Sequence, residues 1–183
     1  GERSMVVLRP ADGEETVMAW KLAVAEHRPV ALVLSRQNIK TLPTLGAIRR
    51  EEAAQVAKGG YVVMDAAKPA AVLIATGSEV ATLVEGAELL AAEGIPVRVV
   101  NVPSEGLFRD QPRSYQESVL PAGVVRYGMT SGLPVNLRGL VGENGVIHGL
   151  DHFGWSAPYK VLDEKFGYNG ATVAAEVKKM LGK

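Results

Sequence analysis

Short apolar runs alternate with helix-like segments along most of this 183-residue chain. The runs are four to six residues long and rich in branched side chains, which favours buried strands; they lie at residues 5–8, 30–34, 61–64, 71–75 and 97–102. Several intervening stretches place apolar residues three and four positions apart, as helices do. Strands that alternate with helices form mostly parallel sheets between layers of helices. The sequence therefore predicts an α/β fold with a mostly parallel sheet sandwiched by helices.

The first two runs flank one helix. Asp12 stands three residues before Glu15, a spacing typical of a capping box at a helix start, and Pro29 ends the helical stretch. Residues 5–34 are thus expected to form one β-α-β unit with parallel strands. Two parallel strands cannot cover both their faces. We therefore expect this partial unit to be the end of a larger domain.

A second series of elements follows a connecting stretch at residues 39–60, which holds one short helix near 50–57 and ends at Gly59-Gly60. Beyond the strands given above, this series has a strand at 124–127 and weak strand signals at 139–146. Helices are predicted at 79–93, 116–120, 159–166 and 172–181. The expected division is one unit at residues 1–55 and a second at 60–183.

Composition excludes several kinds of protein. Lys plus Arg and Asp plus Glu are 20 each, so no net field would attract nucleic acid or an anionic membrane. No apolar run is long enough to span a bilayer. The absence of cysteine excludes a disulfide scaffold and a thiolate zinc site, and it fits a cytoplasmic protein.

Ser35-Arg36-Gln37-Asn38 directly follows the strand at 30–34. Open parallel sheets bind ligands outside the carboxyl ends of their strands, and a guanidinium there can hold a phosphate with two parallel hydrogen bonds. From their position alone, the same residues could equally form a polar loop that leaves the strand and binds no ligand.

Two other places are weaker candidates. Thr76-Gly77-Ser78-Glu79 opens a helix and could seat a nucleotide phosphate, although Ser78 serves equally as a helix cap and Glu79 would repel an anion. His148 and His152 are four residues apart, but the glycines around them disfavour the helix that metal ligation would need. No catalytic, cofactor-binding or metal-binding residue is predicted.

Several segments, in order, resemble the C-terminal portion of transketolases. They are Arg9-Pro10-Ala11-Asp12-Gly13, Ser35-Arg36-Gln37-Asn38, Ile74-Ala75-Thr76-Gly77-Ser78-Glu79-Val80, Gly94-Ile95-Pro96-Val97-Arg98-Val99-Val100, His152-Phe153-Gly154-Trp155-Ser156-Ala157-Pro158 and Lys165-Phe166-Gly167-Tyr168. The resemblance implies that residues 1–55 end the domain that binds the pyrimidine of thiamine diphosphate, and that 60–183 are the C-terminal domain.

Transketolases, as the resemblance implies, are cytoplasmic homodimers of the pentose phosphate pathway that move a two-carbon ketol unit from a ketose phosphate to an aldose phosphate. Thiamine diphosphate and a Mg²⁺ or Ca²⁺ ion serve the full-length enzyme. The family's Gly-Asp-Gly metal motif is absent from this sequence. We therefore expect this chain alone to bind no cofactor and to be inactive.

The resemblance assigns one site residue directly: Arg36 matches the arginine that binds the substrate phosphate, and Ser35 and Gln37 are adjacent candidates. The chain departs from the family at residues 128–134 and at Trp155, which replaces a small residue. An alternative is a partner-docking domain of a related thiamine enzyme, such as the β-subunit of a 2-oxoacid dehydrogenase.

Overall fold

The computed structural model describes residues 4–183, and its main sheet has five strands. They are β3 (Tyr61–Met64), β4 (Ala71–Ala75), β5 (Val97–Asn101), β6 (Val125–Met129) and β7 (Val146–His148), arranged in the order β3-β5-β4-β6-β7. β5 and β6 both pair parallel to the central β4, and β7 pairs parallel to β6. Only β3 runs antiparallel, beside β5. The predicted mostly parallel sheet is confirmed.

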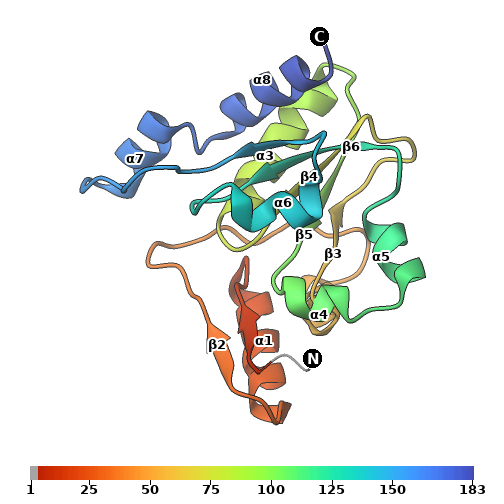
Figure 1. Ribbon diagram of the computed structural model, residues 1–183, viewed down its shortest axis with the longest axis vertical. Helices are drawn as coiled ribbons and strands as arrows, with labels where there is room; N and C mark the ends of the chain where they lie inside the picture. Colours follow the sequence, from red (N-terminus) through yellow and green to blue (C-terminus); the bar gives the residue numbers. More distant parts are fainter. Residues whose placement is uncertain (1–3) are drawn as a thin grey trace.

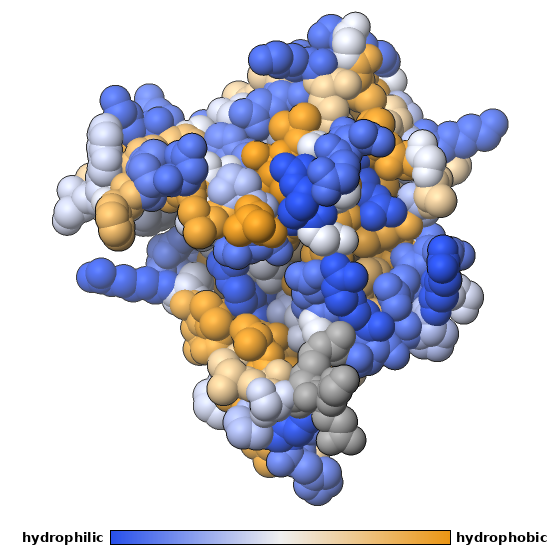
Figure 2. All heavy atoms as spheres, viewed as in Figure 1, coloured by the Kyte–Doolittle hydropathy of each residue, from blue (hydrophilic) through white to orange (hydrophobic). Residues whose placement is uncertain are grey.

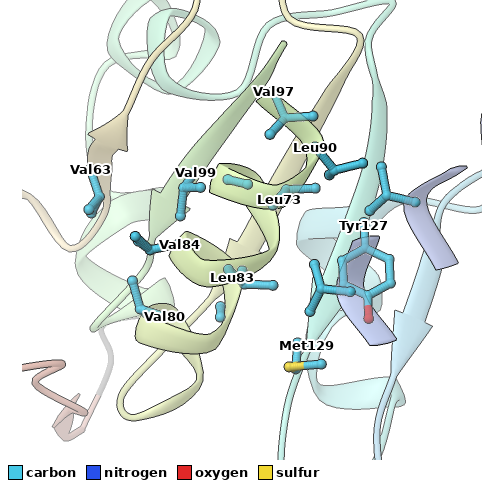
Figure 3. Packing of buried hydrophobic residues seen from close by; sticks show 14 of the residues in the cluster. Val63, Leu73, Val80, Leu83, Val84, Leu90, Val97, Val99, Tyr127 and Met129 are labelled. Atoms are coloured by element: carbon cyan, nitrogen blue, oxygen red, sulfur yellow. The ribbon is translucent and has the colours of Figure 1, made fainter. Parts of the chain in front are cut away.

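Helices cover both faces of this sheet (Figure 1). On one face lie α3 (Glu79–Ala92) and α8 (Gly170–Met180), and Figure 3 shows Leu83 and Leu90 of α3 beside strand residues such as Leu73. The other apolar cluster joins the sheet to α4 (Glu105–Arg109), α5 (Arg113–Val119) and α6 (Val135–Val141). All of β4 is buried between these layers, which explains its continuous apolar sequence.

The N-terminal unit contains β1 (Val6–Leu8), α1 (Gly13–Ala25) and β2 (Val30–Leu32), with β1 parallel to β2 as predicted. β2 is shorter than the predicted strand because its partner turns away: Arg9 N donates to Pro103 O at 2.8 Å, and Pro10 has no N–H. The sheet of this N-terminal unit has only these two strands, and apolar side chains of the unit lie on the lower part of the surface in Figure 2. About half of the residue surface is exposed at four apolar positions in or beside the strands: Met5, Val7, Val33 and Leu34.

Three other segments differ from expectation. The connecting stretch forms α2 (Arg49–Ala53) followed by the 3-10 helix η1 (Ala54–Lys58), rather than one helix. α4 was not predicted. The weak strand signals at 139–146 are wrong except at Val146, the first residue of β7, because α6 continues to Val141 and a turn occupies residues 142–145. Leu137, Leu140 and Val141 have helical spacing and are all buried, so packing overrides the turn preference of Gly139.

A buried polar cluster joins the N-terminal unit to the main sheet. It consists of Asp12, Glu15, Arg49, Tyr61 and Asn101, hereafter the Asp12–Arg49 cluster. Arg49 Nε donates to Asp12 at 2.5 Å, and its Nη2 donates to the Tyr61 hydroxyl at 2.8 Å. That hydroxyl donates to Glu15 at 2.7 Å, and Asn101 Nδ2 donates to the same carboxylate at 2.8 Å. Burial raises the pKa of Glu15, against the opposing effect of these hydrogen bonds.

Candidate functional site

Ser35, Arg36 and Gln37 lie in the loop that follows β2, near the carboxyl end of that strand. Ser35 Oγ donates to the carbonyl of Gln37 at 3.1 Å, which holds the loop in a turn. The Arg36 side chain is exposed, and across residues 4–183 nothing forms a hydrogen bond or ion pair with it. Its five N–H groups are therefore free to bind an anion.

A cavity of about 690 Å³ separates this loop from the segment before and within α7 (Tyr159–Phe166). Figure 1 shows the two as the orange segment after β2 and the blue segment on the left, which are far apart in sequence. The lining residues are Arg36, Gln37, Asn38, Trp155, Ser156, Ala157, Pro158, Tyr159 and Leu162. The cavity thus combines one unpaired cation with an apolar wall.

A second cavity, of about 510 Å³, shares Gln37, Asn38 and Tyr159 with the first and extends to the start of α3. The carboxylate of Glu79 occupies this helix start: it accepts from Ser131 N at 2.9 Å and lies 3.6 Å from Arg9 Nη2. Burial raises the pKa of Asp163, and the negative charge of Glu79 raises it further. A phosphate would be repelled here, so the nucleotide site considered at residues 76–79 is not supported by the geometry.

A third cavity, of about 410 Å³, lies beyond the carboxyl ends of β4, β5 and β6, where open sheets often bind ligands. Its two arginines already have acidic partners. Arg9 lies near Glu79, and Arg28 Nη2 donates to Glu26 at 2.7 Å. Among these cavities, the one beside Arg36 is therefore the stronger candidate for binding an anion.

His148 has a structural role that its spacing from His152 did not indicate. Its Nδ1 lies 3.2 Å from Glu176 of α8, and its Nε2 lies 2.8 Å from the carbonyl of Phe166 at the end of α7. Two acceptors require a proton on both ring nitrogens. The hydrogen bond with Glu176 raises the pKa of His148, although burial opposes the shift. Within residues 4–183, no three His, Asp or Glu side chains gather into a possible metal site.

We expect His148→Gln to weaken the dependence of stability on pH. A raised pKa stabilises the fold fully below the unfolded value of 6.5, and this stabilisation is lost as the pH rises through the folded value. Urea unfolding between about pH 6 and about pH 8.5 should show a steeper fall for the original chain than for the variant. His152→Gln, at an exposed position, is the control and should keep the original slope.

The profile of the transketolase-like TK C-terminal domain matches residues 59–169. The plasmid transketolase of Cupriavidus necator is 44% identical over 176 residues, which cover 96% of this chain and 26% of that protein. The chain belongs to the transketolase family. The predicted resemblance is confirmed.

Solved transketolases share this fold. The enzyme of Leishmania mexicana matches with a TM-score of 0.87 and 34% identity, over 98% of this chain and 25% of that one. A Pichia stipitis transketolase in complex with sedoheptulose-7-phosphate matches with a TM-score of 0.87 and 32% identity, over the same shares of the two chains. The chain thus spans about a quarter of the length of the transketolases that it matches.

Sequence reasoning identified the loop at 35–37 but missed the opposite wall of its cavity. Trp155 and Tyr159 are more than a hundred residues away in sequence, and only the packing of α7 brings them near Arg36. The departure of Trp155 from the family pattern was the one available signal. No helix in the described part of the chain is long and apolar enough to cross a membrane.

Proposed function

We propose that this chain is the C-terminal part of a transketolase that transfers a two-carbon ketol unit from a ketose phosphate to an aldose phosphate. Residues 1–55 would complete the pyrimidine-binding domain, and 60–183 would form the C-terminal domain of a cytoplasmic homodimer in the pentose phosphate pathway. Family membership supports the reaction class. The N-terminal sheet has only two strands, and four apolar residues in or beside them are exposed (Met5, Val7, Val33 and Leu34), which supports the proposal that this unit belongs to a larger domain.

The observation that carries the substrate assignment is the free guanidinium of Arg36 beside an open cavity. We assign Arg36 to the substrate phosphate, with Ser35 and Gln37 as adjacent candidates. A guanidinium binds phosphate through two parallel, charge-assisted hydrogen bonds. The complex of the Pichia stipitis relative with sedoheptulose-7-phosphate supports a phosphorylated sugar as the ligand class.

Thiamine diphosphate and a divalent cation supply the carbanion chemistry of this enzyme class. The residues described here do not fit that role, because they include no cluster of metal-ligating side chains. We therefore assign no cofactor-binding residue to this chain and propose that it is inactive by itself. The alternative, a docking domain of a 2-oxoacid dehydrogenase, is not favoured, since the similar proteins are transketolases.

Arg36→Gln in the complete enzyme that carries this sequence tests the assignment. Loss of a charge-assisted phosphate contact should raise KM for a phosphorylated ketose by about 10- to 100-fold, with little change in kcat. KM for an unphosphorylated ketose should stay unchanged. Arg50→Gln is the matched control, because Arg50 is exposed but pairs with Glu14 away from the cavity. Equal KM values for the variant and the original enzyme would contradict the proposal.

A further inference from the structure

The loop that carries Arg36, at residues 33–48, is fixed at few points. It begins after β2, ends at α2 and has no regular secondary structure. Leu42 is its one buried residue, at 3% exposed, and Leu42 N donates to the carboxylate of Asp12 at 3.0 Å. The part of the loop before Leu42, which includes Arg36, therefore has no buried anchor of its own.

Lys40 ties this part of the loop to the C-terminal unit. Its Nζ donates to the carboxylate of Glu85 on α3. This is the one ion pair that the loop forms with any of the residues 4–183. The hydrogen bond with Glu85 raises the pKa of Lys40, and the negative charge of Glu88 adds to the shift. The ammonium group is thus a permanent cation, four residues after Arg36 in the sequence.

Glu85 stands on a rigid part of the C-terminal unit. α3 and α8 approach closely there, because a Cβ atom on Gly170 would lie 2.8 Å from the Cβ of Glu85, and one on Gly86 would lie 2.5 Å from Cγ1 of Val173. The apolar side of α3 is buried against the sheet. A helix packed this closely cannot shift without opening the core, so Glu85 is a fixed point for the loop.

The cavity of about 510 Å³ lies between this loop and α3. Gln37 and Lys40 line it from the loop, and Glu85 lines it from α3, so the ion pair joins its two sides. A guanidinium holds a phosphate by two parallel hydrogen bonds, which require a defined orientation. A loop that is already held in place loses less conformational freedom when the phosphate binds.

We propose that Glu85 is a positioning residue for the substrate phosphate, which holds the loop through Lys40 in the place from which Arg36 binds. This inference rests on the proposed function. Glu85 acts without touching the substrate, and the C-terminal unit thereby takes part in substrate binding. The ion pair is partly exposed, so its loss should change KM by about two- to five-fold, the range that such pairs allow.

Glu85→Gln in the complete enzyme that carries this sequence is the main test, because two explanations predict opposite signs. Removal of a negative charge near the site would by itself favour a phosphorylated substrate and lower its KM. Loss of the ion pair should instead raise KM for a phosphorylated ketose about two- to five-fold. The value of kcat and the KM for an unphosphorylated ketose should stay unchanged.

Glu88→Gln is the matched control. Glu88 is exposed on the same helix and its charge also acts on Lys40, but it forms no hydrogen bond or ion pair with the loop. Its substitution should not raise KM. A double variant then shows whether Lys40 and Glu85 act as a pair, since Glu85→Gln should raise KM no further once Lys40→Gln is present.

Arg36→Gln separates this inference from the proposed function. Suppose that Arg36→Gln raises KM as expected. The inference is then overturned if Glu85→Gln leaves KM unchanged or lowers it, raises KM for both kinds of ketose, matches Glu88→Gln, or adds to the effect of Lys40→Gln; the proposed function stands in each case. If Arg36→Gln itself leaves KM unchanged, the phosphate assignment fails and the inference fails with it.

Discussion

Replacing Arg49 with methionine is expected to destabilise the chain by about 3–5 kcal/mol, because it leaves buried carboxylates without their cation. Methionine keeps most of the aliphatic stem, so the change removes charge more than volume. Arg49 is 9% exposed, and both Asp12 and Glu15 are fully buried. Asp12 would keep its hydrogen bonds from the backbone N–H groups of Glu15 and Leu42 but lose its ion pair. Urea denaturation measures the loss.

The neighbouring residue provides a matched control. Arg50 forms the same kind of ion pair, with Glu14, but its side chain is 62% exposed. Exposed pairs contribute little because water solvates both ions, so Arg50→Met should leave the denaturation midpoint nearly unchanged. If the free energy of unfolding fell equally in Arg49→Met and Arg50→Met, burial would not explain the contribution of the Asp12–Arg49 cluster to stability.

Gly59→Ala is expected to cost about 3–5 kcal/mol, from a strained backbone and a steric clash together. Gly59 ends η1 with φ of 76°, a conformation that favours glycine. A Cβ atom there would overlap the backbone of α4 at Ser104 and Phe108, and would lie 2.7 Å from the carbonyl carbon of Leu107. Relief requires α4 to move away from η1, which would also break the hydrogen bond from Ser104 N to Gly59 O at 3.0 Å.

Gly94→Ala separates the effect of backbone strain from that of the steric clash. Gly94 has φ of 74°, but a Cβ atom there would meet no atom within 4 Å. Its substitution should cost only the strain of the left-handed conformation, about 1–2 kcal/mol. Thermal unfolding of both variants gives the comparison. Similar losses for Gly59→Ala and Gly94→Ala would show that the close approach of α4 is unimportant.

The α/β fold was predictable because β3 and β4 are continuous apolar runs and the following strands alternate with helical segments. β3 and β4 have the predicted bounds, and so does α7. The antiparallel direction of β3 was not predictable, since an apolar run carries no information about its direction in a sheet. α4 and α6 are short, and their apolar residues became recognisable only through burial against the sheet.

The candidate site and the Asp12–Arg49 cluster likewise contain features that local sequence could predict and features that depend on tertiary contacts. Its position after a strand made Arg36 a candidate, but the same position fitted a polar loop without a ligand, and only the resemblance to transketolases assigned it to the substrate phosphate. The role of Glu15 was only half predictable. Asp12 does cap α1, with Oδ1 accepting from Glu15 N at 2.8 Å, but the Glu15 carboxylate accepts from Ala11, Tyr61 and Asn101 instead of completing a capping box. Those tertiary partners lie up to 86 residues away and leave no local pattern.

The Asp12–Arg49 cluster also bears on any attempt to isolate the C-terminal unit. A chain started between residues 55 and 60 would keep Tyr61 and Asn101 but lose all three ionisable partners. The Tyr61 hydroxyl and the Asn101 amide would then face solvent at the end of a sheet otherwise built from apolar side chains. A truncated version would therefore need these two positions redesigned before its behaviour represented that of the unit in the intact protein.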